Sequence, residues 1–173
     1  MELKELIRSV PDFPKKGIVF RDITTLLKSP EGLNKTLDEL YNLSKNKGIT
    51  KVVGIESRGF ILGGALAAKL GAGFVPVRKP GKLPAEKISE SYFLEYGTDS
   101  IEIHKDAIQP GDIVLLHDDL LATGGTMRAA CNLIEKLGAS VSQISFLIEL
   151  SFLNGRDKLK DYEIHSLVDY SSE

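Results

Sequence analysis

Apolar positions along the chain switch repeatedly between helical and strand spacing. Apolar residues three and four apart over residues 3–10 predict a short first helix, which Pro11 ends. Ser29 followed by Pro30 is typical of a helix start, and the apolar face over residues 33–41 predicts a second helix that Gly48 ends. The further expected elements are strands at 51–55 and 73–77, a helix at 60–70, a hairpin of 92–95 with 101–104, a strand at 113–116, a helix face over 127–137, and strands at 141–150 and 164–168.

This alternation predicts an α/β fold with a mainly parallel central sheet flanked by helices. The run from Ile113 to Leu116 is apolar throughout, as expected for a strand covered on both faces. Residues 80–104 begin with a segment rich in Lys, Pro and Gly and continue into the hairpin, so we expect an inserted antiparallel flap there. Because neither a repeat nor a long polar linker interrupts the chain, we expect a single domain over residues 1–173.

Composition narrows the possible partners. The chain has 173 residues and a formal net charge of −2, with 42% hydrophobic and 27% charged residues. That balance gives no general attraction to nucleic acid or to an anionic membrane. The longest strongly apolar stretch, residues 60–68, is far shorter than a membrane span requires. A single cysteine, Cys131, excludes an intramolecular disulfide framework, so we expect a reducing compartment, the cytoplasm.

One segment carries most of the chemical information. The apolar strand at 113–116 is followed by the acids Asp118 and Asp119 and then by Thr123-Gly124-Gly125-Thr126, where the next helix is expected to begin. Glycines let backbone N–H groups face an anion, the start of a helix favours negative charge, and threonines add hydroxyl donors. The segment therefore predicts a phosphate-binding loop beside two carboxylates that suit polyol hydroxyls or a hydrated divalent cation.

Other candidate motifs are excluded or weak. The Gly-Lys-[Ser/Thr] element of a Walker A loop is missing, and no Gly-x-Gly-x-x-Gly fingerprint is present. The segment 54–59 has one residue too many for the nucleophile elbow of a serine hydrolase. The three histidines, His104, His117 and His165, show no metal-ligand spacing, and we interpret them as structural or solvent-exposed. Cys131 lies on an apolar helix face and is expected in the core.

The segment 114–127 resembles the phosphoribosyl pyrophosphate (PRPP) signature of the type I phosphoribosyltransferase family. Four further segments resemble the adenine-using branch of that family, in the same order along the chain. They are Pro11–Pro14 with Gly17–Ile23, Glu56–Phe60, Arg78–Pro84 and Ser91–Gly97. Two positions depart from the family pattern: His117 replaces an apolar residue, and Glu56 replaces a common Asp while keeping the carboxylate.

The resemblance implies a type I phosphoribosyltransferase fold and a reaction in which adenine and PRPP give AMP and pyrophosphate. It places the 5′-phosphate on the phosphate loop and the ribose hydroxyls on the two acids. It also implies Mg²⁺, held mainly by the diphosphate and water rather than by protein ligands. The implied residues for ribose phosphate are Asp118, Asp119, Ala122, Thr123, Gly124, Gly125 and Thr126, and those for the diphosphate are Arg58, Arg78, Lys79, Lys82 and Tyr96.

For the base, the resemblance points to residues 1–30 as a small N-terminal hood. Backbone groups of Val19 and Arg21 would bind adenine, and Phe20 would stack on the purine. Glu95 on the flap would assist proton removal from the base. The structural alternatives are that Phe20 is a core aromatic, that Arg21 and Asp22 form an ion pair that fixes the loop, and that Glu95 is a solvated hairpin acid. The family further implies a homodimer.

Two other functions stay open at this stage. The first is transfer to hypoxanthine, guanine or xanthine; such enzymes need a donor, often Lys, for the carbonyl of the base and place their base-binding residues near the C-terminus. The second is a PRPP-sensing regulator that binds nucleic acid, which would carry an added helix-turn-helix or a broad basic face. The N-terminal position of the base-binding motif and the net charge of −2 favour the adenine-using enzyme over both.

Overall fold

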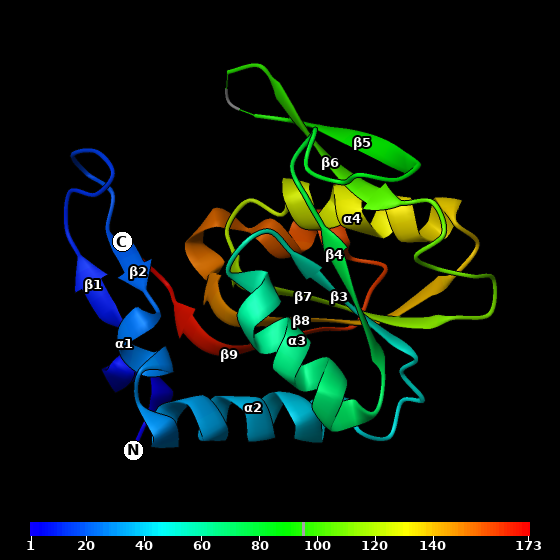
Figure 1. The fold of residues 1–173 in the computed structure, drawn as a ribbon. Coiled ribbons are helices and arrows are strands. Elements are labelled where there is room, and N and C mark those ends of the chain that lie inside the picture. Colours follow the sequence, from blue (N-terminus) through cyan, green and yellow to red (C-terminus); the bar gives the residue numbers. More distant parts are fainter. Residues whose placement is uncertain (95) are drawn as a thin grey trace.

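A sheet of five parallel strands forms the centre of the computed structural model, which describes residues 1–94 and 96–173 (Figure 1). Its strands, in spatial order, are β4 (Gly73–Val77), β3 (Lys51–Ile55), β7 (Ile113–Leu121), β8 (Ser140–Leu150) and β9 (Ile164–Tyr170). β-Branched and leucine side chains dominate β3, β7 and β8, and the burial of these strands on both faces explains why their apolar runs do not alternate. The expected α/β fold with a mainly parallel sheet is therefore confirmed.

Helices cover both faces of the sheet. Helices α2 (Pro30–Ser44) and α3 (Gly59–Leu70) pack on one face, where Leu40, Leu62 and Leu66 meet the apolar side chains of the strands. Helix α4 (Gly125–Lys136) covers the other face. The Ser29 hydroxyl accepts the N–H of Gly32 and caps α2, as the sequence predicts, but α2 ends at Ser44 rather than near Gly48. Among the described residues, no helix has the length and apolarity needed to cross a bilayer.

The N-terminal segment contains a strand where a continuous helix is expected. Residues Leu3–Leu6 form one 3₁₀ turn, η1, and the chain then extends into β1 (Arg8–Val10). Strand β1 pairs antiparallel with β2 (Phe20–Asp22), and the short helix α1 (Thr24–Leu27) follows. The prediction of a helix over 3–10 is wrong because pairing with a strand ten residues away outweighs a weak local helical pattern.

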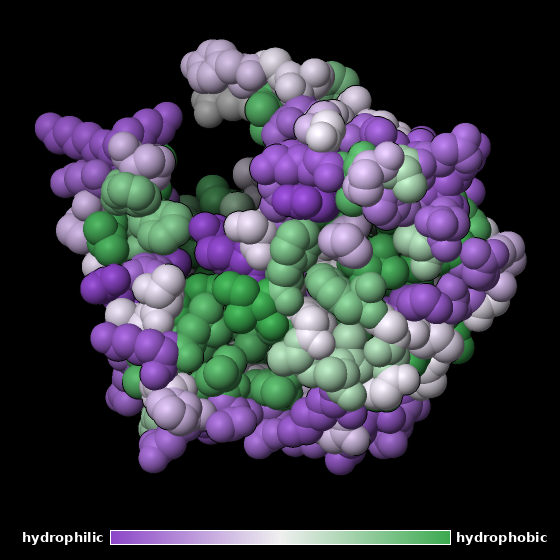
Figure 2. All heavy atoms as spheres, viewed as in Figure 1, coloured by the Kyte–Doolittle hydropathy of each residue, from purple (hydrophilic) through white to green (hydrophobic). Residues whose placement is uncertain are grey.

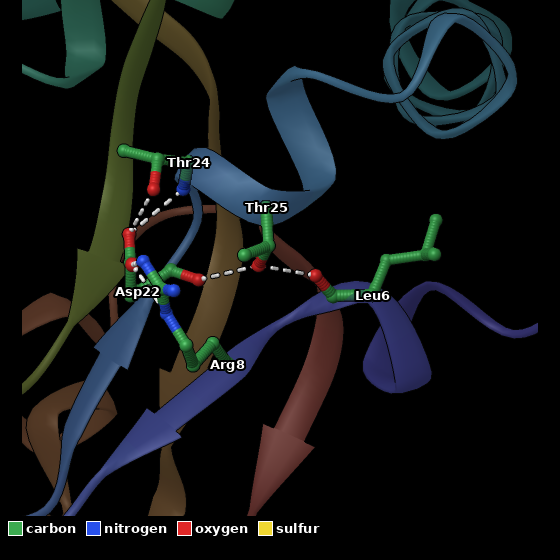
Figure 3. Close-up of polar contacts among 5 residues, drawn as sticks. All are labelled: Leu6, Arg8, Asp22, Thr24 and Thr25. Carbon is green, nitrogen blue, oxygen red and sulfur yellow. Dashed lines mark hydrogen bonds and ion pairs between the residues drawn. The ribbon is translucent and has the colours of Figure 1, made fainter.

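Polar contacts of Asp22 fix this N-terminal unit (Figure 3). The Asp22 carboxylate accepts hydrogen bonds from the N–H and hydroxyl of Thr24 and pairs with Arg8. These contacts lower the pKa of Asp22 to about 2, and the hydrogen bond from the Thr24 hydroxyl has the largest effect. Thr25 donates its hydroxyl to the carbonyl of Leu6, 2.6 Å away, and so ties α1 to η1. The proposed Arg21–Asp22 ion pair is absent among the described residues, since Arg8 takes that place.

The flap is a two-stranded hairpin of β5 (Lys87–Phe93) and β6 (Thr98–His104), longer than the pattern predicts. Ile101 and Ile103 of β6 are buried in the core cluster that also contains the inner face of α4, so the hairpin lies over that helix (Figure 1). After β8, two 3₁₀ turns, η2 (Ser151–Leu153) and η3 (Gly155–Leu159), return the chain toward β9. The hairpin end and η3 both reach the start of α4.

Candidate active site

The order of the strands defines a switch point between β3 and β7. From β3 the chain continues outward to β4, whereas from β7 it continues in the opposite direction to β8 and β9. In open parallel sheets, ligands bind at the carboxyl ends of the strands at such a point. The loop after β3 carries Arg58, and the end of β7 carries the two acids and the phosphate loop.

The two acids lie within β7 rather than beyond its end. Pairing of β7 with β3 stops at His117, but pairing with β8 continues to Leu121. Asp118 and Asp119 therefore lie on an extension of β7 that has a neighbour on one side only. A Cβ at Gly59 would lie 3.0 Å from Oδ1 of Asp118, so only glycine lets α3 start this close to the acids. The expectation that the strand stops at the acids is thus corrected.

Asp118 and the phosphate loop line one cavity of about 210 Å³. Its other loop residues are Ala122, Thr123, Gly124, Gly125 and Thr126. Helix α4 begins at Gly125, directly after Gly124, whose φ of +86° is favourable only for glycine. Burial and the neighbouring Asp119 carboxylate raise the pKa of Asp118 well above its usual range. The geometry joins an anion-binding helix start to a carboxylate, as expected for a sugar phosphate.

The phosphate loop is supported by a segment that the sequence does not predict to lie at the site, η3. Gly155 of η3 is buried against the loop, and a Cβ there would lie 2.4 Å from the carbonyl oxygen of Ala122. A Cβ at Gly124 would in turn lie 2.5 Å from the carbonyl oxygen of Gly155. Arg156, the next residue, is held by two hydrogen bonds to the carboxylate of Glu149. Only the glycine itself, inside an otherwise polar segment, is a local sign of this contact.

Arg58 connects the acids to the N-terminal hood. Its Nε donates to Oδ2 of Asp119 at 2.5 Å, and its guanidinium carbon lies 5.3 Å from the centre of the Phe20 ring. Phe20 is partly exposed and contacts Phe13 edge to face, so it is not a core aromatic. Three predicted site residues from three distant segments therefore adjoin one another.

The remaining predicted diphosphate residues gather on two other carboxylates. Glu56 accepts from Nε of Arg78 at 2.9 Å and lies 3.3 Å from Nζ of Lys82. Although burial opposes the shift, these cations lower the pKa of Glu56. Lys79 pairs with Asp99 at 2.7 Å. These three cations thus share two carboxylates, which neutralise their charge in part.

The predicted adenine contacts lie on β2 and just before it. The N–H of Val19 already donates to Oε2 of Glu173 at 3.1 Å. The guanidinium of Arg21 lies over the ring of Tyr170, 3.9 Å from its centre. Tyr96 is 87% exposed at the end of the hairpin, and the predicted catalytic residue Glu95 lies outside the described residues.

His117 and Cys131, which have no predicted role in the site, lie in the protein interior. His117 is fully buried, its Nδ1 lies 3.0 Å from the Ser145 hydroxyl, and burial lowers its pKa to about 4. Burial raises the pKa of the Cys131 thiol to about 12, in keeping with a core residue. Within residues 1–94 and 96–173, no group of three or more His, Cys, Asp or Glu side chains is arranged to hold a metal ion.

Comparisons with known proteins agree with this geometry. The model of the phosphoribosyl transferase domain matches residues 22–168. Adenine phosphoribosyltransferase of Phocaeicola vulgatus is 66% identical over 89% of this chain and 88% of its own length. The crystal structure of adenine phosphoribosyltransferase from Thermoanaerobacter pseudethanolicus has a TM-score of 0.94 and 53% identity, covering 97% of this chain and 98% of that one.

A more distant solved structure carries ligands. It is the adenine phosphoribosyl transferase of Trypanosoma brucei in complex with AMP, pyrophosphate and ribose-5-phosphate, with a TM-score of 0.89 and 26% identity over 96% of this chain and 77% of that one. The chain belongs to the phosphoribosyl transferase domain family and, within it, to the adenine phosphoribosyltransferases.

Proposed function

We propose that this chain transfers the 5-phosphoribosyl group of PRPP to adenine, giving AMP and pyrophosphate, a purine salvage reaction. The observation that carries the proposal is the cavity shared by Asp118 and the loop from Ala122 to Thr126 at the switch point of the sheet. It offers a phosphate-binding helix start and a sugar-binding acid side by side. The family membership supports the same reaction.

For the ribose phosphate, backbone N–H groups of the loop and the hydroxyls of Thr123 and Thr126 would bind the 5′-phosphate. Asp118 and Asp119 would accept hydrogen bonds from the ribose hydroxyls. Such bonds to a charged acceptor contribute more than neutral ones, and the buried position of Asp119 shields them from water.

For the diphosphate, Arg58, Arg78, Lys79 and Lys82 would exchange their present carboxylate partners for diphosphate oxygens. Two of them, Arg78 and Lys82, share the single carboxylate of Glu56, so part of their positive charge stays uncompensated and attracts an incoming anion. Tyr96 would close over the diphosphate from the hairpin. This exchange would stabilise the negative charge that grows on the departing diphosphate.

Mg²⁺ is the proposed cofactor. The described part of the site offers the two adjacent acids and no larger ligand cluster, which fits an ion bound chiefly by diphosphate oxygens and water. When bound, the ion neutralises diphosphate charge. The side chains of Asp118 and Asp119 would orient the ribose in its presence.

For the base, the backbone groups of Val19 and Arg21 would bind the purine edge, and Phe20 would stack on its face. The ring nitrogen of adenine forms a bond to the anomeric carbon while the bond from that carbon to diphosphate breaks, through an oxocarbenium-like state. Glu95 would accept the proton that the ring nitrogen loses. Closing of the flap, residues 80–104, over the hood would exclude water from this centre.

The proposed assembly is a homodimer built on the outer face of α3. Ile61 is 50% exposed, and Figure 2 shows apolar side chains gathered over this helix. An exposed apolar helix face is typical of a surface that another chain covers. Sedimentation of the wild type and of Ile61→Lys tests it: we expect a dimer that the substitution weakens, and a monomeric wild type would contradict it.

The proposed location is the cytoplasm, on the basis of one buried free cysteine and a reaction between phosphorylated metabolites. Apart from a second copy of the chain, we propose only the small-molecule substrates as partners. We propose neither a nucleic acid nor a membrane as a partner.

An activity assay tests the function. Purified protein with PRPP and Mg²⁺ should consume adenine and release AMP and pyrophosphate in equal amounts, and removal of Mg²⁺ with a chelator should suppress the reaction. Parallel reactions with hypoxanthine, guanine and xanthine test the nearest alternative. A preference for an oxo-purine would overturn adenine as the substrate, and salt-dependent retention on nucleic acid without turnover would favour a regulator.

A further inference from the structure

Lys158 borders the phosphate loop and is not one of the site residues that the sequence predicts. It lines a cavity of about 690 Å³ together with Thr123 and Thr126. It also lines a second cavity of about 210 Å³ together with Gly125 and Arg128. Lys158 therefore borders the loop from η3, a segment about 30 residues further along the chain, although it does not line the cavity that Asp118 shares with the loop.

The segment that carries Lys158 is fixed on both sides of it. Two residues earlier, the Arg156 guanidinium is bound to both carboxylate oxygens of Glu149, at 2.7 and 2.9 Å. The next residue, Leu159, is fully buried in the core. With Gly155 packed on the loop, η3 is a rigid support that holds the lysine beside the helix start.

The neighbouring cations have other contacts. Lys79, which lines the larger cavity, pairs with Asp99, and Arg128, which lines the smaller one, stacks over the ring of Tyr162 and keeps its charge. Within residues 1–94 and 96–173, Lys158 makes neither a hydrogen bond nor an ion pair with another side chain. The loop from Ala122 to Thr126 contains no cation of its own. A phosphate group on the loop would therefore meet backbone dipoles and the charge of Lys158.

We propose that Lys158 is a further substrate-binding residue, which contacts the 5′-phosphate group on the loop rather than the diphosphate. The proposal rests on the proposed function. Its physical basis is that a compact ammonium group on a fixed segment neutralises a dianion that the neutral loop binds only through N–H and hydroxyl donors.

Binding measurements on the full chain test this directly. For Lys158→Ala we expect the affinity for ribose 5-phosphate and for AMP to fall about tenfold, and the affinity for pyrophosphate to change by less than about twofold. The KM for PRPP should rise while the KM for adenine is unchanged. Lys160→Ala is the matched control, because Lys160 is an exposed lysine two residues away that lines neither cavity. Lys158→Arg should restore most of the affinity.

Two results would overturn the proposal: unchanged ribose 5-phosphate binding in Lys158→Ala, or an equal loss of pyrophosphate binding. Ribose 5-phosphate carries no base, so its binding separates the role of Lys158 from the proposed function. If the wild type binds ribose 5-phosphate but does not convert adenine, the proposed function fails and the test of Lys158 still stands.

Discussion

Gly155 packs directly on Ala122 of the phosphate loop, so that a Cβ at position 155 would lie 2.4 Å from the Ala122 carbonyl oxygen. Backbone is in contact with backbone there, and neither side has a flexible group that moves aside at little cost. The shape of the loop therefore depends on a residue far outside the motif that defines it.

Gly155→Ala should displace the loop. We expect a loss of about 2 kcal/mol in the free energy of unfolding, because overpacking a rigid contact has this typical cost, together with a raised KM for PRPP. Chemical denaturation and steady-state kinetics measure the two effects. Gly63→Ala is the control, since the nearest atoms to a Cβ at that helical position lie at 3.7 and 3.8 Å, which are ordinary contact distances. Equal behaviour of the two variants would contradict the role of Gly155.

Asp118→Asn should separate activity from stability. The pKa of Asp118 is raised in the folded protein by burial and by Asp119, so its charged form destabilises the fold as pH rises above the ordinary value of 3.8. At pH 7 the neutral amide should therefore raise Tm, while PRPP turnover falls between about tenfold and a hundredfold because a charged acceptor is lost. Asp119→Asn, which removes the partner of Arg58, should lose turnover without the gain in Tm. A fall in Tm for Asp118→Asn would refute the expected destabilisation.

His117 should make the fold sensitive to acid. Burial lowers its pKa to about 4 from 6.5, while the unfolded chain binds the proton at the ordinary value. Stability is thus unaffected above about pH 6.5 and falls as the pH drops from 6.5 to about 4, by about 3 kcal/mol in total. Denaturation midpoints measured across this window should decline less steeply for His117→Val. His165→Gln, at a partly exposed histidine, should follow the wild type.

Glu173→Ala should release the backbone N–H of Val19, which its carboxylate now occupies. If adenine uses that N–H, the KM for adenine should fall about fivefold, the range expected for removal of one competing hydrogen bond. The KM for PRPP should stay constant. Ser172→Ala is the control, because the group of Ser172 that accepts from Arg21 is its backbone carbonyl, which the substitution keeps. A rise in the KM for adenine would mean that Glu173 shapes the base site instead.

Glu95→Gln tests the proposed proton acceptor. Loss of a general base should lower kcat about a hundredfold with a much smaller change in adenine affinity. Pre-steady-state kinetics with adenine in excess distinguish the chemical step from binding. Glu90→Gln is a matched substitution on β5, where Glu90 pairs with Lys136 of α4. If only the KM for adenine changes, Glu95 binds the base and does not remove its proton.

Local patterns were sufficient for the class of fold and for the central motif. The strand at Ile113–Leu116, the helix cap at Ser29 and the loop from Thr123 to Thr126 are each determined by residues that are close in the sequence. These features are fixed by backbone preferences and by burial on both faces of a strand, which are readable within a few residues. The order of the motifs then indicated which segments belong to one site.

Contacts between distant segments were decided only by the tertiary structure. Strand pairing replaced the expected helix at Arg8–Val10, and pairing with β8 extended β7 through the acids. The support of the loop by Gly155 and the contact of Glu173 with Val19 join residues more than 30 and 150 positions apart. Such contacts form because packing and charge compensation bring segments together in space, and one segment alone carries no signal of its partner.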